Sequence, residues 1–302
     1  MLIKRIFRAR QLYLMLLLPM IYLIVFKYIP MGGLTIAFKE YSASEGILKS
    51  PWVGLKYFRK FFMDYNFSRV LVNTLRVSIY TLTVNSIVPI LLALSLNCIR
   101  NRFVRKTVQT ITYIPHFISV VVLVGIVIQM LNPVIGLYGT AASAITGNRP
   151  ADILGIPSSF LHIYVWSGVW QNAGWDSIIY IAALANSDQE LHEAAQIDGA
   201  SRFQRVRYVD IPTIIPTAII LLILNSGKIM SIGFEKAYLL QNSLNLGYSE
   251  VISTYVYKQA FGTGMTNFSY STAIGFFNSV INFLLIASVN QISKKMNDTS
   301  LW

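Results

Sequence analysis

The sequence is poor in charged residues. Only 13 % of its 302 residues are Asp, Glu, Lys or Arg, whereas 54 % are hydrophobic, and the mean hydropathy is +0.54. A typical soluble domain carries about 25 % charged residues, so this chain has too few to cover a surface exposed to water. The same composition excludes an intrinsically disordered chain. The class that fits is a membrane protein, in which each helical span needs about 20 apolar residues.

Cysteine and the common catalytic motifs are also scarce. The single cysteine, Cys98, excludes an intrachain disulfide, and no cysteine–histidine metal spacing occurs. The chain has no Gly-x4-Gly-Lys-Ser/Thr loop, so we do not expect it to hydrolyse ATP. Its three histidines are scattered and form no HExxH motif. The sequence therefore offers no catalytic residues and no metal site.

Long apolar runs dominate the rest of the chain. They are too long for ordinary strands and lack the alternation of a β-barrel, so we expect an all-α protein with six transmembrane helices. The first run has no small-residue cleavage site after it, which favours a retained span over a signal peptide. The six runs cover residues 12–30, 77–96, 111–131, 160–184, 212–230 and 272–289.

The positions of the basic residues predict the orientation. The net charge is +12, and 13 of the 25 basic residues fall in short segments beside the ends of the spans if the N-terminus is inside. This density favours a cytoplasmic N-terminus and C-terminus, and it gives the positive charge a topological reading in place of nucleic-acid binding. The 13 residues are Lys4, Arg5, Arg8, Arg10, Arg100, Arg102, Arg105, Lys106, Arg202, Arg205, Arg207, Lys294 and Lys295.

This orientation divides the chain into one membrane domain, 1–302, with defined connecting segments. We expect residues 1–10 and 290–302 to be cytoplasmic ends and 186–211 to be a cytoplasmic loop. Residues 31–70 then form a long extracytoplasmic loop. That loop holds six basic residues, but it also carries Glu40, Glu45 and Asp64.

The cytoplasmic loop carries its own helix signals. Ser187 and Glu190 have the spacing of a capping box, so a helix should begin at Asp188. Gly199 tolerates a left-handed conformation and should end that helix. Ser201 begins a second short helix with the same spacing, and Phe203 and Val206 are predicted on its inner face. The product is a pair of short helices around a glycine turn, which is either a docking surface for another protein or an ordinary solvated loop.

The same loop resembles the EAA loop of ATP-binding-cassette importer permeases. The matching residues are Glu193-Ala194-Ala195, Asp198-Gly199-Ala200, Ile211-Pro212 and Pro216. Similar permeases also share the patterns Val53-Gly54-Leu55-x-x-Phe58 and Asn73-Thr74-Leu75. The region 234–302, with its Phe234–Leu240 stretch and its terminal Ser300-Leu301-Trp302, resembles the polysaccharide-permease subgroup that includes the LplB-type and alginate-importer permeases.

The resemblance implies a non-catalytic transmembrane subunit with the type I ABC importer permease architecture. Such a subunit pairs with a second, similar permease and with two cytoplasmic ATPase subunits, which bind the ATP and Mg²⁺. This chain would bind no cofactor itself. An extracytoplasmic substrate-binding protein would deliver the cargo. By position in the motif, the ATPase-coupling residues would be Glu193, Ala194, Ala195, Asp198, Gly199 and Ala200.

Polar residues within the apolar runs are candidates for the substrate path, because such residues usually face a cavity or a neighbouring helix. Aromatic rings and amides suit the faces and hydroxyl edges of a sugar. The alternative is that the tryptophans anchor the membrane interface and the amides join helices. The candidates in the fourth run are Trp170, Gln171, Asn172, Trp175 and Asp176.

The fifth run ends in two further candidates, Asn225 and Lys228. Similar disaccharide permeases place sugar-contacting polar residues near the first of these. Lys228 has three alternatives: an ion pair with Asp176 or Glu235, an outward-pointing side chain, or contact with an acidic sugar. In the sixth run Asn278 and Asn282 are four residues apart on one face, which favours contact between helices.

Taken together, these residues predict the permease subunit of an oligosaccharide importer in the bacterial cytoplasmic membrane that works by alternating access. An acidic oligosaccharide is among the candidate cargoes. A smaller sugar or a sugar phosphate is the alternative within the family. Outside it, the alternatives are an ion-coupled secondary transporter that uses Asp176, and a membrane scaffold that transports nothing.

Overall fold

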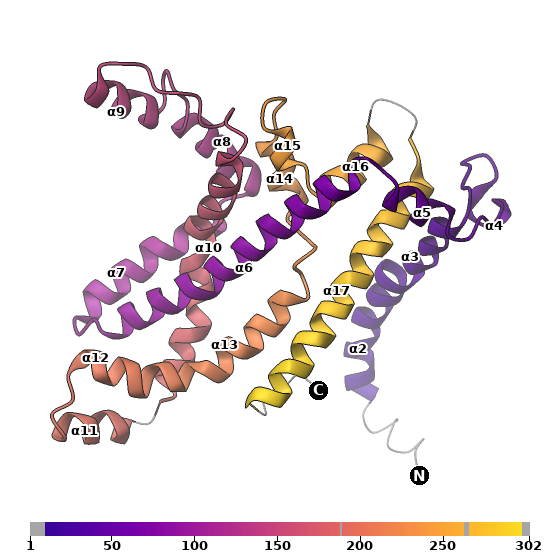
Figure 1. Cartoon of the computed structure of the whole chain (residues 1–302). Helices are drawn as coiled ribbons and strands as arrows, with labels where there is room; N and C mark the ends of the chain where they lie inside the picture. Colours follow the sequence, from indigo (N-terminus) through magenta and orange to yellow (C-terminus); the bar gives the residue numbers. More distant parts are fainter. Residues whose placement is uncertain (1–9, 188, 263–265, 298–302) are drawn as a thin grey trace, which may run out of the picture. The chain divides into compact units, whose positions relative to one another are not determined.

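The computed structural model describes residues 10–187, 189–262 and 266–297 (Figure 1). In these ranges every regular element is helical, and the only strand-like feature is an isolated antiparallel bridge between Lys39 and Trp52. The all-α prediction is confirmed for this part of the chain. The predicted helix start at Asp188 and the C-terminal Ser300-Leu301-Trp302 lie outside the described residues.

The chain divides into two compact units. Unit 1 consists of Met1–Asp64 with Val256–Phe277, and unit 2 consists of Tyr65–Tyr255 with Asn278–Trp302. Two helices, α16 (Ile252–Phe261) and α17 (Phe268–Asn297), contribute residues to both units.

Unit 1 begins with a long apolar helical run and continues with two short helices. The run joins α2 (Arg10–Leu23), the π-helical turn η1 (Ile24–Tyr28), α3 (Ile29–Met31) and the 3-10 helix η2 (Gly32–Phe38). None of the most apolar window of this run is buried in the chain, as expected of a helix that meets lipid or a partner. The short helices are α4 (Gly46–Lys49) and α5 (Lys56–Phe62).

Aromatic side chains form the core of unit 1. Phe61 of α5 is buried and meets the rings of Tyr270 and Phe277 edge-on, with centroids 6.4 and 5.6 Å away. The hydroxyl of Tyr270 donates a hydrogen bond of 2.7 Å to the Asp64 carboxylate. These contacts pack the segment that precedes α6 against the first turns of α17.

Unit 2 is built on two long helices that pack along each other, α6 (Phe67–Asn97) and α10 (Ser159–Ala185). Val77 of α6 and Phe160 and Val165 of α10 belong to one buried apolar cluster. α13 (Ile211–Ser226) closes a second cluster through Ile214, which packs with Ala93 and Tyr180. The elements beside this pair are α7 (Arg102–Tyr113), η3 (Ile114–Phe117), α8 (Val120–Met130) and α9 (Leu137–Thr146).

The third predicted run is not one continuous helix. α7 with η3 and α8 meet at an angle of 103°. Pro115 lacks the backbone N–H that a continuing helix needs, and Ser119 starts α8 by accepting a hydrogen bond from the Val122 N–H at 3.3 Å. The expected helix over 111–131 is therefore corrected to a broken one, and its first part begins at Arg102.

Short elements cover one end of unit 2. They are α14 (Phe234–Leu240) and α15 (Leu246–Ser249). Asn73 of α6 donates hydrogen bonds of 2.9 and 3.1 Å to the carbonyls of Gly247 and Glu250, and the Thr74 hydroxyl accepts one from the Ile252 N–H at 2.9 Å. The Asn73-Thr74-Leu75 pattern thus fixes this covering segment to α6.

Lys236 of α14 is buried against α10. Its ammonium donates a hydrogen bond of 2.6 Å to the Tyr164 carbonyl and lies 4.7 Å from the centre of the Tyr164 ring. Burial lowers the pKa of Lys236 to about 8. The buried ammonium of Lys236 is therefore stabilised by a carbonyl acceptor and a cation–π contact, without a carboxylate partner among the described residues.

Helix length and hydropathy identify four candidate membrane spans among the described residues, or five if the bent pair counts as one. α10 has 27 residues, which is long enough, but its polar residues keep it out of this set. The four spans are Arg10–Phe38, Phe67–Asn97, Arg202–Ser226 and Phe268–Lys295, and the bent pair is Arg102–Phe117 with Val120–Met130.

Candidate functional site

The predicted glycine turn is present between α11 (Gln189–Ile197) and α12 (Arg202–Arg205). Gly199 has φ of +77°, and its N–H donates to the Gln196 carbonyl at 3.1 Å. The Ala200 N–H reaches back to the Ala195 carbonyl at 2.9 Å. This pair of hydrogen bonds is a Schellman motif, which ends a helix with a left-handed residue. No atom lies within 4 Å of the place where a Cβ of Gly199 would be, so the backbone conformation is what favours glycine.

The second predicted capping box is also confirmed. The Ser201 hydroxyl accepts from the Gln204 N–H at 3.3 Å, and the Gln204 side chain accepts from the Ser201 N–H at 2.7 Å. However, the helix that follows is not a separate short one. It runs through the π-helical turn η4 (Val206–Asp210) into α13, so that Arg202–Ser226 is one helix of 25 residues.

Pro212 explains the π-helical turn. The Ile211 N–H bonds to the Val206 carbonyl, five residues earlier, which widens the turn just before a proline that has no N–H. The wider turn also rotates what precedes it. Phe203, which was predicted on an inner face, is 79 % exposed, whereas Asp210 is buried and Val206 is half-buried.

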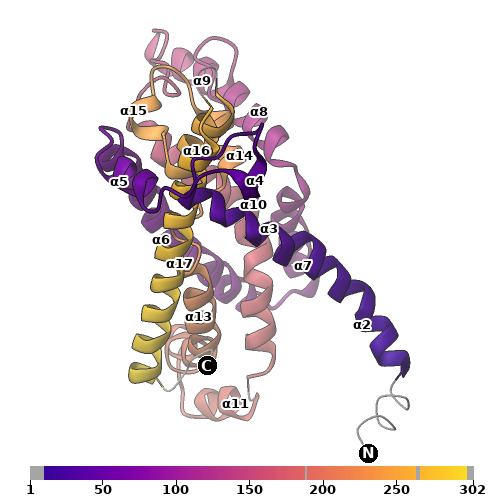
Figure 2. The same cartoon turned by 90° about the vertical axis from the view of Figure 1, so that its right-hand side faces the viewer.

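The coupling loop, defined here as residues 189–205, lies at the end of unit 2 opposite α9 and α15 (Figures 1 and 2). Of the residues that the EAA pattern singled out, Glu193, Ala194, Asp198 and Gly199 are exposed, and Ala195 and Ala200 are half-buried. Small exposed side chains allow a partner to approach the backbone of α11 closely. The loop therefore offers an accessible surface that the described residues leave largely uncovered.

A polar network joins the coupling loop to two long helices. The His192 ring of α11 lies 3.2 Å from a carboxylate oxygen of Asp210, and the Asn97 amide at the end of α6 donates to the same oxygen at 3.3 Å. Asp210 is buried, so these partners replace the water that its carboxylate has lost. Movement of α11 is thus tied to both α6 and α13.

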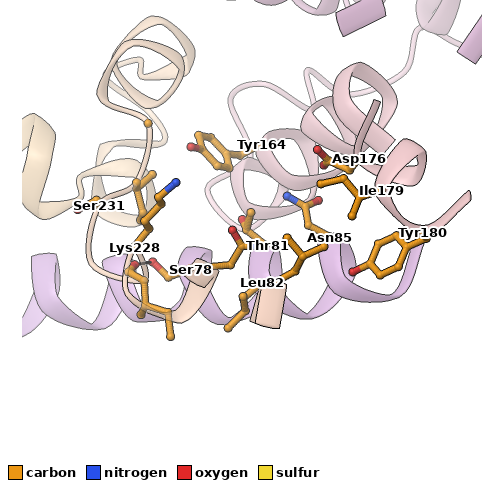
Figure 3. Close-up of a pocket in the computed structure, with 15 residues that line it drawn as sticks. Ser78, Thr81, Leu82, Asn85, Tyr164, Asp176, Ile179, Tyr180, Lys228 and Ser231 are labelled. Atoms are coloured by element: carbon orange, nitrogen blue, oxygen red, sulfur yellow. Dashed lines mark hydrogen bonds between the residues drawn. The ribbon is translucent and has the colours of Figure 1, made fainter. Parts of the chain in front are cut away.

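A cavity of about 320 Å³ lies within unit 2, between α6, α10 and the end of α13 (Figure 3). It brings together three of the predicted substrate-path residues, Asp176, Asn225 and Lys228. Its other lining residues are Ser78, Thr81, Leu82 and Asn85 of α6, Tyr164, Ile179 and Tyr180 of α10, and Leu221, Ile229, Ser231, Ile232 and Gly233.

The lining combines one carboxylate and one ammonium with amides, hydroxyls and tyrosine rings. Lys228 and Asp176 point toward the cavity from opposite sides, with Thr81 and Asn85 of α6 between them in the view of Figure 3. In the part of the chain that the structure describes, no ion pair joins Lys228 to Asp176 or to Glu235. The buried hydroxyl of Thr81 has no hydrogen-bond partner among those residues, so it is available to a bound molecule.

The other four predicted substrate-path residues do not line this cavity. The Gln171 amide donates a hydrogen bond of 2.8 Å to the Ile118 carbonyl, and the Asn172 carbonyl oxygen lies 2.9 Å from a ring nitrogen of His116. Both amides thus join α10 to the break between α7 and α8. Trp175 stacks on the His116 ring at 4.5 Å, and Trp170 is 52 % exposed. A cargo role for these four stays a prediction.

Three lining residues on α6 were missed from the sequence. Ser78, Thr81 and Asn85 are separated by three and four residues, so they share one face of the helix. That spacing in an otherwise apolar run is the signal that marks them. The Ser78 hydroxyl also donates to the Ile229 carbonyl and holds the wall of the cavity beside Lys228.

Neither location offers a metal site. Within residues 10–187, 189–262 and 266–297, no group of three or more His, Cys, Asp or Glu side chains is placed to hold a metal ion. The Asn282 amide of α17 accepts a hydrogen bond from the Met230 N–H at 2.9 Å and donates one to the Ser231 hydroxyl at 2.8 Å. Met230 and Ser231 lie in the segment after α13, so this contact joins α17 to a connecting segment at the cavity's edge, and the helix–helix contact predicted for Asn278 and Asn282 stays a prediction.

Two curated proteins resemble the chain over nearly its full length. Protein LplB of Bacillus subtilis (strain 168) is 40 % identical over 295 residues, which are 98 % of this chain and 92 % of LplB. The polygalacturonan/rhamnogalacturonan transport system permease protein YteP of the same organism is 38 % identical over 301 residues, 100 % of this chain and 93 % of YteP.

The chain also resembles solved structures of transporters and matches a known protein family. A chain of a bacterial ABC transporter involved in the import of the acidic polysaccharide alginate has a TM-score of 0.89 at 37 % identity, over 98 % of this chain and 99 % of that one. The same kind of transporter, in complex with an alginate pentasaccharide-bound periplasmic protein, gives 0.90 at 36 % identity, over 99 % of both chains. Residues 85–298 match the family described as binding-protein-dependent transport system inner membrane component. The chain belongs to that family.

Proposed function

We propose that this chain is a permease subunit of an ATP-driven, binding-protein-dependent importer that moves an oligosaccharide across the bacterial cytoplasmic membrane. One observation carries the proposal. A single helix, Arg202–Ser226, begins in the exposed coupling loop, and Asn225 in its last turn lies in the wall of the polar cavity. The chain thus connects a surface for a cytoplasmic partner to a site for a polar cargo.

The coupling loop is the surface for the partner. In this proposal α11 docks on a cytoplasmic ATPase, and Glu193 meets donor groups there while Gly199 keeps the turn open. ATP and Mg²⁺ bind to two such ATPases and not to this chain. When the ATPases close, α11 moves with them, and the His192–Asp210–Asn97 network passes the movement to α13 and α6. The preference of ATP for the closed ATPases biases the transport cycle.

The cavity is the site for the cargo. Sugars present hydroxyl groups and apolar ring faces, and the cavity offers Asn85 and Asn225 amides, the free Thr81 hydroxyl and the rings of Tyr164 and Tyr180. The names of the relatives, which include alginate and polygalacturonan, support an oligosaccharide with acid groups. Lys228 lines the cavity and would attract such a carboxylate.

The proposal also includes the topology. We infer six spans with both ends in the cytoplasm, in which α10 is the additional span. It tolerates its polar residues because Asp176 lines the cavity, whereas Gln171 and Asn172 contact the break between α7 and α8. The coupling loop then faces the cytoplasm, and a second permease subunit completes the path. An extracytoplasmic binding protein delivers the oligosaccharide.

Reconstitution tests the function. The chain would be purified with its partner permease and ATPases, placed in liposomes, and supplied with ATP inside and binding protein with labelled oligogalacturonate outside. We expect uptake that requires both ATP and the binding protein. Uptake by the chain alone, driven by an ion gradient, would favour a secondary transporter, and ATPase binding without any uptake would favour a scaffold.

The cargo site has its own test. Lys228→Met should raise the KM for an acidic oligosaccharide by about ten- to a hundredfold, because a charge-assisted hydrogen bond is worth about 1.5–3 kcal/mol. The KM for a neutral oligosaccharide should change much less. The matched control is Lys49→Met, which removes the same charge from an exposed position outside the cavity. Equal changes for both sugars would remove Lys228 from the recognition of acid groups.

A further inference from the structure

A second cavity, of about 440 Å³, lies at the base of the coupling loop. It is enclosed by the end of α6, the end of α10, α11, α12 and η4, all within unit 2. Its charged and amide lining includes Arg100, Arg202, Arg205, His192, Asp210 and Gln196. None of these residues belongs to the cavity proposed for the cargo, and the transport cycle described above uses only His192 and Asp210.

The charge of this cavity is strongly one-sided. Three arginines, two of them exposed and Arg205 half-buried, line it together with one acidic residue, Asp210. The carboxylate is already engaged, because the His192 ring and the Asn97 amide both contact its Oδ1 atom. Among the described residues, Arg100, Arg202 and Arg205 form no ion pair at 4 Å or less. Among the described residues that line the cavity, the arginines therefore exceed the carboxylates by two.

Arg205 shows that the site has unused donors. Its Nε atom is buried and has no hydrogen-bond partner in the part of the chain that is described. Among the described residues, its guanidinium donates only a long hydrogen bond, 3.4 Å to the Gln196 side-chain oxygen. A buried N–H without an acceptor costs free energy, and a ligand that accepts from it recovers that cost.

The three arginines come from distant parts of the sequence. Arg100 follows α6, whereas Arg202 and Arg205 lie on α12, about one hundred residues later. A cytoplasmic excess of basic residues explains why they are on this side of the membrane, but it does not explain why they line one cavity. Arg207 has the same topological position and is exposed outside that lining.

We propose that this cavity binds a phosphate group. Guanidinium groups match the oxygens of phosphate in pairs, and two or three of them around one cavity can hold a dianion. Its volume leaves room for what the phosphate is attached to. The two sources are an anionic phospholipid headgroup and a soluble phosphate compound of the cytoplasm.

Phosphate in this place would act on coupling. It would bridge Arg100 beside α6 to Arg202 and Arg205 on α12, next to the glycine turn. The bridge fixes the angle between the coupling loop and α6 in addition to the His192–Asp210 contact. A transporter with phosphate bound should therefore convert ATPase closure into uptake more efficiently than one without.

The experiment uses the complete transporter in nanodiscs with two arms. In the lipid arm, phosphatidylglycerol in a phosphatidylcholine background is titrated, and retained lipid is measured by native mass spectrometry together with uptake per ATP in matched liposomes. In the soluble arm, inorganic phosphate is titrated in phosphatidylcholine alone and its binding is followed by phosphorus NMR. The variants are Arg202→Gln and Arg205→Gln, with Arg207→Gln as the matched control.

We expect retention in at least one arm, and each cavity variant should weaken it by about tenfold while Arg207→Gln leaves it unchanged. Retention in the lipid arm alone identifies the headgroup as the source, and retention in the soluble arm alone identifies a cytoplasmic phosphate. The proposal fails if neither arm shows retention, or if Arg207→Gln weakens it equally. It also fails if the cavity variants release the ATPases without changing phosphate retention, because the arginines then contact the partner protein.

Discussion

The left-handed turn at Gly199 allows the coupling mechanism to be tested with small changes. The perturbation is a series at one position: Gly199→Ala, Gly199→Asn and Gly199→Asp. Since no atom of the described residues lies within 4 Å of the added Cβ, the Cβ of each variant is placed without a clash. What changes is the cost of holding φ at +77°.

The expected magnitude follows from that conformation. A left-handed backbone costs an ordinary L-residue roughly 1–2 kcal/mol, which corresponds to about a five- to thirtyfold smaller population of the native turn. The Schellman hydrogen bonds and the Ser201 capping box hold both sides of the turn. We therefore expect Gly199→Ala to reduce the population of the native turn by about fivefold, which is the lower end of that range. Asn tolerates the left-handed region better than Ala, so Gly199→Asn should reduce the population of the native turn by about twofold or less.

The Asp variant separates charge from backbone strain. It resembles Asn in backbone preference but places a second carboxylate beside Asp198 on a surface that the ATPase contacts in our proposal. We therefore expect Gly199→Asp to abolish uptake and to uncouple ATPase stimulation, while the protein still inserts in the membrane. The repulsion between the added carboxylate and Asp198 on a docked surface then adds to the backbone strain.

The assay measures ATP-dependent uptake and binding-protein-stimulated ATP hydrolysis in liposomes, normalised to the inserted transporter. Gly147→Ala is the matched control, because Gly147 has φ of +71° and equally open surroundings at the end of α9. It should cost similar stability and leave coupling intact. The reasoning is refuted if Gly199→Ala and Gly199→Asp transport normally, or if Gly147→Ala reduces coupling as much as Gly199→Ala does.

Three further outcomes follow from the structure. Phe203→Ala should weaken ATPase retention in detergent by about ten- to a hundredfold, since burying an exposed Phe at an interface is worth about 1.5–3 kcal/mol. Phe117→Ala, at a similarly exposed position outside the loop, should not weaken it. Ser201→Ala should lower the thermal midpoint of unfolding by the equivalent of about 1 kcal/mol, whereas Ser201→Asp, which keeps a capping oxygen, should retain most of it. Because burial lowers the pKa of Lys236 to about 8, its charge destabilises the folded state fully below pH 8 and progressively less up to the unfolded value of 10.5. Wild-type stability relative to Lys236→Met should therefore rise by about 3 kcal/mol over this range, and parallel pH profiles of thermal unfolding would contradict that account.

The apolar runs predicted the helices well because span length and composition are local properties. Residues 160–184 were predicted as a helix, and α10 covers Ser159–Ala185. The break between α7 and α8 was missed, since it depends on Pro115 together with a contact from Gln171, 53 residues away from Ile118. Such a partner cannot be read from a local pattern.

The candidate site was predictable to a different degree in its two parts. Gly199 and Ser201 are governed by their own neighbours, so the turn and the capping box followed from spacing. The exposure of Phe203 did not follow from the spacing of the residues. The π-helical turn at Val206–Asp210 rotates the helix face, and the regular 3.6-residue period of an α-helix does not include that rotation. In the cavity, position along the helix alone did not separate Asp176, which lines it, from Asn172, which binds His116.

The continuous helix Arg202–Ser226 determines how far a small tilt at the coupling loop displaces the residues at its other end. At 1.5 Å per residue, 25 residues span about 37 Å, so the coupling turn and Asn225 are two ends of one rod. A tilt of about ten degrees about the turn displaces the far end by about 6 Å, which is comparable to the length of one sugar ring. In the proposed function, the length of this helix therefore sets how far a movement of the coupling loop displaces Asn225 in the cavity wall.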